Sequence, residues 1–123
     1  MQSALEAIHE YYRAFSTLDL KAIVGYFCEP SMTIAAQGVF SAGNHAALAE
    51  SLAPMVHALR AKGYGRSEFV QSQVMTLGDR AALVRGIAVR YTAAGPEMER
   101  IPISYLMHRS EAGWKIAVLL AEN

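Results

Sequence analysis

The order of segments along the chain predicts an α+β fold. Apolar residues recur at helical spacing in the first half of the sequence, interrupted by one short β-prone stretch, and four long β-prone runs fill the second half. Helices and strands therefore do not alternate, which favours an antiparallel sheet over a parallel one. With 123 residues, the chain has the length of one typical domain, so we expect a single domain over residues 1–123.

Two helices are expected at the beginning of the chain. In the segment 3–18, Ile8 and Phe15 lie at the centre of an apolar stripe with the spacing of a helix. Asp19 offers a carboxylate that can accept a hydrogen bond from the first free backbone N–H groups of a second helix. We expect Pro30 to end this second helix, because proline lacks a backbone N–H and its ring collides with the preceding turn.

A third helix and the strands complete the expected fold. The third helix follows the break at residues 42–44 and ends before Gly63, and Pro54 inside it predicts a kink or a break. Turn-forming residues separate the β-prone runs. The strands are expected at residues 31–36, 67–77, 80–91, 99–109 and 113–121.

Apolar residues occupy both faces of the expected sheet. Along the second long strand, Ile87 and Val89 alternate with Val84 and Ala88, so neither face is polar. Three helices can cover only one face of such a sheet. We expect the other face to pack against a second copy of the chain, which would make the protein a homodimer.

Composition and charge argue against several classes of function. Eleven basic and eleven acidic residues give a net charge of zero, which disfavours a nucleic-acid or membrane-surface partner. No apolar run approaches the roughly 20 residues that cross a bilayer. Cys28 is the only cysteine and the N-terminus carries no signal-peptide pattern, so we expect a cytoplasmic location. Metal-ligand spacings and phosphate-binding glycine motifs are absent from the sequence, so we expect no cofactor.

Two segments of the sequence carry a family resemblance. These are YYRAFSTLDLKAIVGYF at residues 11–27 and GWKI at residues 113–116. Together with the order of helices and strands, they make the whole chain resemble the nuclear transport factor 2-like (NTF2-like) superfamily, above all its SnoaL-like and ketosteroid-isomerase-like members. The resemblance implies a cystatin-like roll, in which a cone-shaped, curved antiparallel sheet wraps around three N-terminal helices and encloses an apolar pocket.

The ketosteroid-isomerase-like members place three catalytic groups at positions that can be compared with this chain. Their chemistry uses a tyrosine and a protonated aspartic acid to hold an enolate oxygen, and a carboxylate to move a proton. The resemblance puts the donor tyrosine on Tyr11, the general base on Ala35 and the second donor on Ser104. Because alanine carries no proton and serine is a weaker donor, we do not expect classical ketosteroid isomerisation.

Few other residues are suited to act as a base. The two aspartates, Asp19 and Asp79, are explained as a helix cap and a turn residue. His108 shares the strand alternation of Ser104, and Glu122 continues that of the last strand. These two are the candidate bases if the protein catalyses proton transfer or the addition and elimination of water. A surface histidine and a frayed terminus are the simpler interpretations of the same residues.

The resulting hypothesis is a conical pocket for a small apolar, carbonyl-bearing molecule, whose oxygen is held by Tyr11 and Ser104. Apolar ligand contacts are expected from Phe15, Phe27, Ile34, Ala35, Leu48, Leu52, Met55, Ile87, Val89 and Leu106. The alternative is a non-catalytic homodimeric assembly module, in which the cone is filled by its own side chains. An open cavity favours the first hypothesis, and a closed core favours the second.

Overall fold

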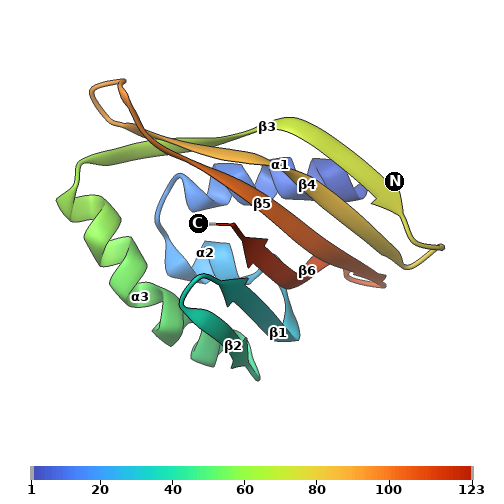
Figure 1. The fold of residues 1–123 in the computed structure, drawn as a ribbon. Coiled ribbons are helices and arrows are strands. Elements are labelled where there is room, and N and C mark those ends of the chain that lie inside the picture. The colour runs from blue at the N-terminus through green and yellow to red at the C-terminus, as the bar shows by residue number, and fades with distance from the viewer. Residues whose placement is uncertain (1, 123) are drawn as a thin grey trace.

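The computed structural model describes residues 2–122, and the chain within them folds into helices on one side of a curved sheet (Figure 1). The helices are α1 (Ala4–Phe15), α2 (Leu20–Val24) and α3 (His45–Ala61). The strands are β1 (Phe27–Ala35), β2 (Gly38–Ala42), β3 (Tyr64–Thr76), β4 (Ala81–Thr92), β5 (Glu97–Ser110) and β6 (Gly113–Ala121). The α+β class predicted from the sequence is confirmed.

The six strands form one sheet in the order β2-β1-β6-β5-β4-β3. From β3 to β6, consecutive strands pair antiparallel, as the meander predicts. One pair departs from the expected antiparallel arrangement, because β1 runs parallel to β6 with Phe27 opposite Ile116 and Ile34 opposite Leu120. After α2 the chain runs alongside β6 as β1, and it then turns back as β2, which pairs antiparallel with β1. The last strand is therefore an interior strand of the sheet, with neighbours on both sides.

Two helices depart from the prediction, α2 at its end and α3 in its interior. α2 ends at Val24, with Gly25 as its C-cap, and Pro30 lies inside β1 rather than at the end of the helix. α3 runs as one helix through Pro54, so the expected break does not occur. Packing of its apolar face offsets the hydrogen bond that proline removes. The buried residues of that face are Leu48, Val56 and Leu59.

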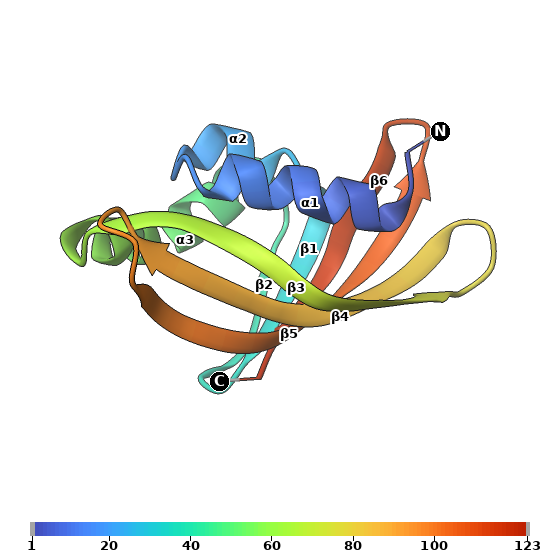
Figure 2. The ribbon, with the colours of Figure 1, turned by 90° about the horizontal axis from the view of Figure 1, so that it is seen from above.

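The sheet curves around α1 (Figure 2). A capping box begins this helix, in which the backbone N–H of Ser3 donates to the Glu6 carboxylate and the backbone N–H of Glu6 donates to the Ser3 hydroxyl oxygen. Its buried stripe, which includes Ile8 and Phe15, packs on the concave face of the sheet. α3 closes one end of the curve (Figures 1 and 2). The concave face thus carries the core, and the convex face is left without a helix among residues 2–122.

Gly86 on β4 permits a close approach of the neighbouring edge strand β3. β3 carries a bulge between Val70 and Gln73, opposite Gly86, and Gln71 within the bulge has a φ of 53°. A Cβ atom at Gly86 would lie 2.7 Å from the ring of Phe69 and 2.8 Å from the carbonyl oxygen of Val70. The missing side chain therefore lets the Phe69 ring lie directly on β4.

Replacing Gly86 by alanine is expected to lower the free energy of unfolding by about 1–3 kcal/mol, because the added methyl group meets backbone as well as a ring. Urea denaturation followed by circular dichroism measures the change. Gly43→Ala is the matched control, since a Cβ at Gly43 meets nothing within 4 Å. If the two variants were equally stable, the close approach at Gly86 would not constrain the fold.

Candidate functional site

A cavity of about 630 Å³ lies inside the curve of the sheet. α1 and α3 form one side of its wall, and the inner faces of β1, β4, β5 and β6 form the other. The volume is within the range of pockets that hold small organic molecules. Most of the wall is apolar, with Leu48 and Leu52 from α3 and Ala88, Ile101 and Ile103 from the sheet.

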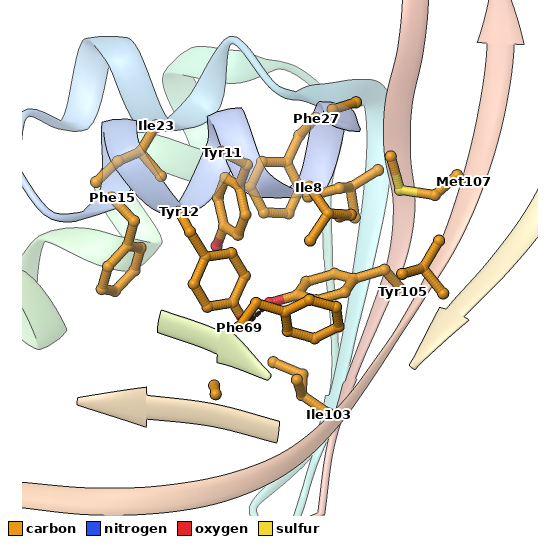
Figure 3. Packing of buried hydrophobic residues seen from close by; sticks show 14 of the residues in the cluster. Ile8, Tyr11, Tyr12, Phe15, Ile23, Phe27, Phe69, Ile103, Tyr105 and Met107 are labelled. Carbon is orange, nitrogen blue, oxygen red and sulfur yellow. Dashed lines mark hydrogen bonds between the residues drawn. The ribbon is translucent and has the colours of Figure 1, made fainter. Parts of the chain in front are cut away.

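Three tyrosines converge in the buried part of the wall (Figure 3). Tyr11 and Tyr12 come from α1, and Tyr105 comes from β5. The hydroxyl oxygens of Tyr12 and Tyr105 are 2.7 Å apart and form a buried hydrogen bond. The ring of Tyr11 meets that of Tyr105 edge to face, with 5.9 Å between centroids, and Phe69 packs on Tyr12 at 5.1 Å. The helix and the sheet are thus joined through aromatic side chains beside the cavity.

The hydroxyl of Tyr11 differs from the other two. Within residues 2–122 it has no hydrogen-bond partner, although Tyr11 is only 5% exposed and lines the cavity. Buried tyrosine hydroxyls ordinarily find a partner, because leaving one unpaired costs free energy. An unpaired hydroxyl in the wall of a cavity is therefore a donor available to a ligand.

Burial raises the pKa of all three tyrosines. For Tyr11 the loss of hydration is the largest cause, and the neighbouring Tyr12 adds to it. Loss of hydration is also the largest cause for Tyr12 and Tyr105. The positive charge of Arg90 lowers the pKa of each by a lesser amount. All three hydroxyls therefore stay protonated near neutral pH and act as uncharged donors rather than as bases.

Arg90 on β4 is the one lining residue with a charged side chain in the described part of the wall. Its side chain is 17% exposed, and Nη1 donates to Glu99 Oε1 on β5 at 2.5 Å. The guanidinium lies over the ring of Phe15, 5.4 Å from the centroid, and Nη2 is 3.9 Å from Met55 Sδ. One carboxylate and one aromatic face therefore hold a half-buried positive charge at the cavity.

The helical part of the predicted site lies in the cavity wall. Tyr11 and Ala35 are both lining residues, as the resemblance implies. The other predicted contacts found there are Phe15, Phe27, Leu48, Leu52 and Met55. Most of these were identified by helical periodicity, which marks the inward face of an amphipathic helix directly.

On β4 and β5, and at Ile34 of β1, the prediction of which residues face the cavity is wrong by one residue. The predicted contacts that do not line the cavity are Ser104, His108, Ile34, Ile87, Val89 and Leu106. The inward residues of β5 include Ile103 and Tyr105 instead, and those of β4 include Ala88 and Arg90. Both faces of these strands are apolar, so alternation does not identify the inner one, and a shift of one residue inverts every side chain.

Neither candidate base lies at the cavity. His108 is exposed on β5, and the carboxylate of Glu122 lies 4.0 Å from Arg85 outside the cavity wall. Aspartate, glutamate and histidine do not occur among the described lining residues. As far as residues 2–122 describe it, the wall therefore offers hydrogen-bond donors and a positive charge, but no carboxylate or imidazole to take up a proton.

Sequence reasoning missed Tyr12, Tyr105 and Arg90 as lining residues. The signal that identifies the inner face of β4 is residue size, because Gly86 and Ala88 share the alternation of Arg90. A row of small residues leaves room for a helix to approach the sheet closely. That criterion places Arg90 inside, and the register of β4 with β5 then places Tyr105 on the same face.

No group of three or more His, Cys, Asp or Glu side chains within residues 2–122 is arranged to hold a metal ion. None of the helices in that same range is both long enough and apolar enough to cross a membrane.

Comparisons with known proteins place the chain in a family. A search of curated protein sequences finds no match. An NTF2-like protein from Novosphingobium aromaticivorans aligns with a TM-score of 0.77 and 20% identity, covering 95% of this chain and 77% of that one. A ketosteroid isomerase-like protein from Erwinia carotovora atroseptica gives a TM-score of 0.64 and 18% identity, covering 97% and 92%.

A third solved structure, a protein of unknown function from Nostoc punctiforme with a cystatin-like fold, gives a TM-score of 0.76 and 10% identity, covering 96% and 86%. At these identities the likeness concerns the fold alone. The model of the family described as NTF2-like protein (DUF6841) matches residues 2–123. The curved sheet and its helices are therefore those of an established family, and this chain belongs to the NTF2-like proteins.

Proposed function

We propose that this domain binds a small, largely apolar molecule and holds a carbonyl oxygen of that molecule at the tyrosines. The observation that carries the proposal is the unpaired hydroxyl of Tyr11 in the wall of a cavity of about 630 Å³. In the described residues Thr92 Oγ1 is the fully buried side-chain atom left without a partner, so the unpaired Tyr11 hydroxyl is open to the cavity. A carbonyl oxygen in the cavity would accept that hydrogen bond, while the apolar wall would bury the rest of the ligand.

The chemistry of the wall supports binding rather than acid–base catalysis. The raised pKa of Tyr11 keeps its hydroxyl protonated, so that it acts as a neutral hydrogen-bond donor. Ala35, at the position where the resemblance puts the general base, lines the cavity with a methyl group. The proposed role is to hold and polarise a carbonyl group without moving a proton.

The second candidate function is an assembly module whose cone is filled by its own side chains. Such a module needs no room inside the sheet. The cavity volume therefore supports the binding function over this alternative.

Acetonaphthone, an aromatic ketone, is a suitable probe for the proposed site. We expect it to raise the unfolding temperature of the wild-type protein, because a ligand that binds only the folded state stabilises it. Tyr11→Phe is expected to weaken ketone binding about three- to tenfold, the contribution of one uncharged hydrogen bond. Ethylnaphthalene, which lacks the oxygen, should bind both proteins equally. Isothermal titration calorimetry measures each affinity.

A blocking variant separates the cavity from other surfaces. Ala35→Trp places an indole inside the cavity wall and is expected to abolish ketone binding. Ala53→Trp, on an exposed and non-lining position of α3, is the matched control and should bind as the wild type does. Ketone binding that survives Ala35→Trp unchanged would overturn the proposed site.

We further propose that the convex face of the sheet packs against a second copy of this chain. Five apolar residues on adjacent strands stand in register across that face: Met75, Leu83, Leu106, Val118 and Met32. Leu106 is 37% exposed, whereas Tyr105 beside it is 1% exposed on the inner face. A continuous apolar row without a covering element supports self-association.

Leu106→Arg is expected to convert the dimer to a monomer, because an arginine at the centre of the row meets its own copy across the interface. Sedimentation velocity measures the mass in solution. Ala53→Arg, at an exposed position on α3 away from the convex face, should leave the dimer intact. A wild-type protein that sediments as a monomer would contradict the proposal outright.

A further inference from the structure

The half-buried Arg90 indicates which class of molecule the cavity binds. It is the charged lining residue of the described wall, and its surroundings there are the ring of Phe15 and the thioether of Met55. A guanidinium among apolar groups has lost most of its hydration, which is costly unless its donors are used. Which of the Arg90 N–H groups already have a hydrogen-bond acceptor therefore determines what the cavity can bind.

Most donors of Arg90 are unused. A guanidinium has five N–H groups arranged as a planar fork. Within residues 2–122, its hydrogen bonds are one from Nη1 to Glu99 Oε1 and one from Nη2 to the sulfur of Met55 at 3.9 Å. A thioether is a weak acceptor. The fork accordingly has room for a second, stronger acceptor from the side of the cavity.

The pair with Glu99 does not by itself explain the position of Arg90. In a surface ion pair both charged groups remain in water, and long arginine side chains usually extend outward to reach it. Here the two partners of the ion pair differ in exposure, because the Glu99 side chain is 41% exposed and that of Arg90 is 17% exposed. The carboxylate stays at the surface while the guanidinium is drawn into the wall, where it faces the cavity.

We propose that the ligand of this cavity is an apolar carboxylic acid, whose carboxylate binds the fork of Arg90. This inference rests on the proposed function, since it specifies the molecule that the cavity holds. Arginine and carboxylate match in geometry, and their charge-assisted hydrogen bonds are stronger than those the neutral hydroxyls of this wall can form. No described lining residue is acidic, and the one carboxylate on the guanidinium, Glu99, occupies Nη1 and lies outside the lining. A carbonyl oxygen elsewhere on the same molecule would accept from Tyr11.

Naphthylacetic acid and naphthylacetamide test the inference, because they share one shape and differ in charge near neutral pH. We expect the wild-type protein to bind the acid at least about tenfold more tightly than the amide, as charge-assisted hydrogen bonds require. In Arg90→Met, which keeps an unbranched apolar side chain, acid and amide should bind with about equal affinity. Arg90→Lys keeps the charge without the fork and should retain part of the preference.

Arg85→Met is the matched control. Arg85 lies on the same strand with a carboxylate neighbour, Glu122 at 4.0 Å, but outside the cavity wall. Its loss should leave the preference for the acid unchanged. Circular dichroism and the unfolding temperature of each variant establish that it is folded.

The outcomes separate this inference from the proposed function. Equal wild-type affinity for acid and amide, or a preference that persists in Arg90→Met, would overturn the carboxylate inference and leave binding in the cavity standing. If acid, amide and ketone all failed to bind the wild-type protein, the proposed function would fail with it.

Discussion

The hydrogen bond between the hydroxyls of Tyr12 and Tyr105 is the contact on which the arrangement of helix and sheet depends. It joins α1 to β5 at 2.7 Å, and both side chains are buried. Removing either hydroxyl would leave the other without a partner, at a cost of about 1–3 kcal/mol. Because each hydroxyl lies at the end of a rigid ring, the pair sets the distance between helix and sheet. The cavity lies in the space between helix and sheet next to these rings.

Residues on the inner face of β4 determine both the packing beside the cavity and its chemistry. Gly86 lets Phe69 lie on β4, and Phe69 in turn supports the ring of Tyr12. On the same inner face, Arg90 acts on all three tyrosines through its positive charge. The site therefore combines neutral hydroxyl donors with one cation inside an apolar wall. Such a site suits an oxygen-rich end on an otherwise apolar molecule.

The sequence predicted the fold class and the helical half of the site because helical periodicity distinguishes an inner face from an outer one. Phe15 and Leu52 were placed in the cavity wall on that basis. Strand parity could not be obtained in the same way, since apolar residues occupy both faces of β4 and β5, and Ser104 was assigned inward where Tyr105 lies. The parallel pairing of β1 with β6 also lay beyond local pattern, because tertiary contacts between distant segments determine it.

The central claim is that the Tyr11 hydroxyl is a free donor facing a cavity that admits a ligand. NMR of protein labelled with carbon-13 at the tyrosine ζ carbons tests it most directly, with the Tyr11 signal assigned from Tyr11→Phe. Titration with acetonaphthone is predicted to shift the Tyr11 signal in a saturable manner and to leave that of Tyr91, which bonds to Glu68 outside the cavity, in place. A Tyr11 signal that stays fixed while the ketone binds would contradict the account.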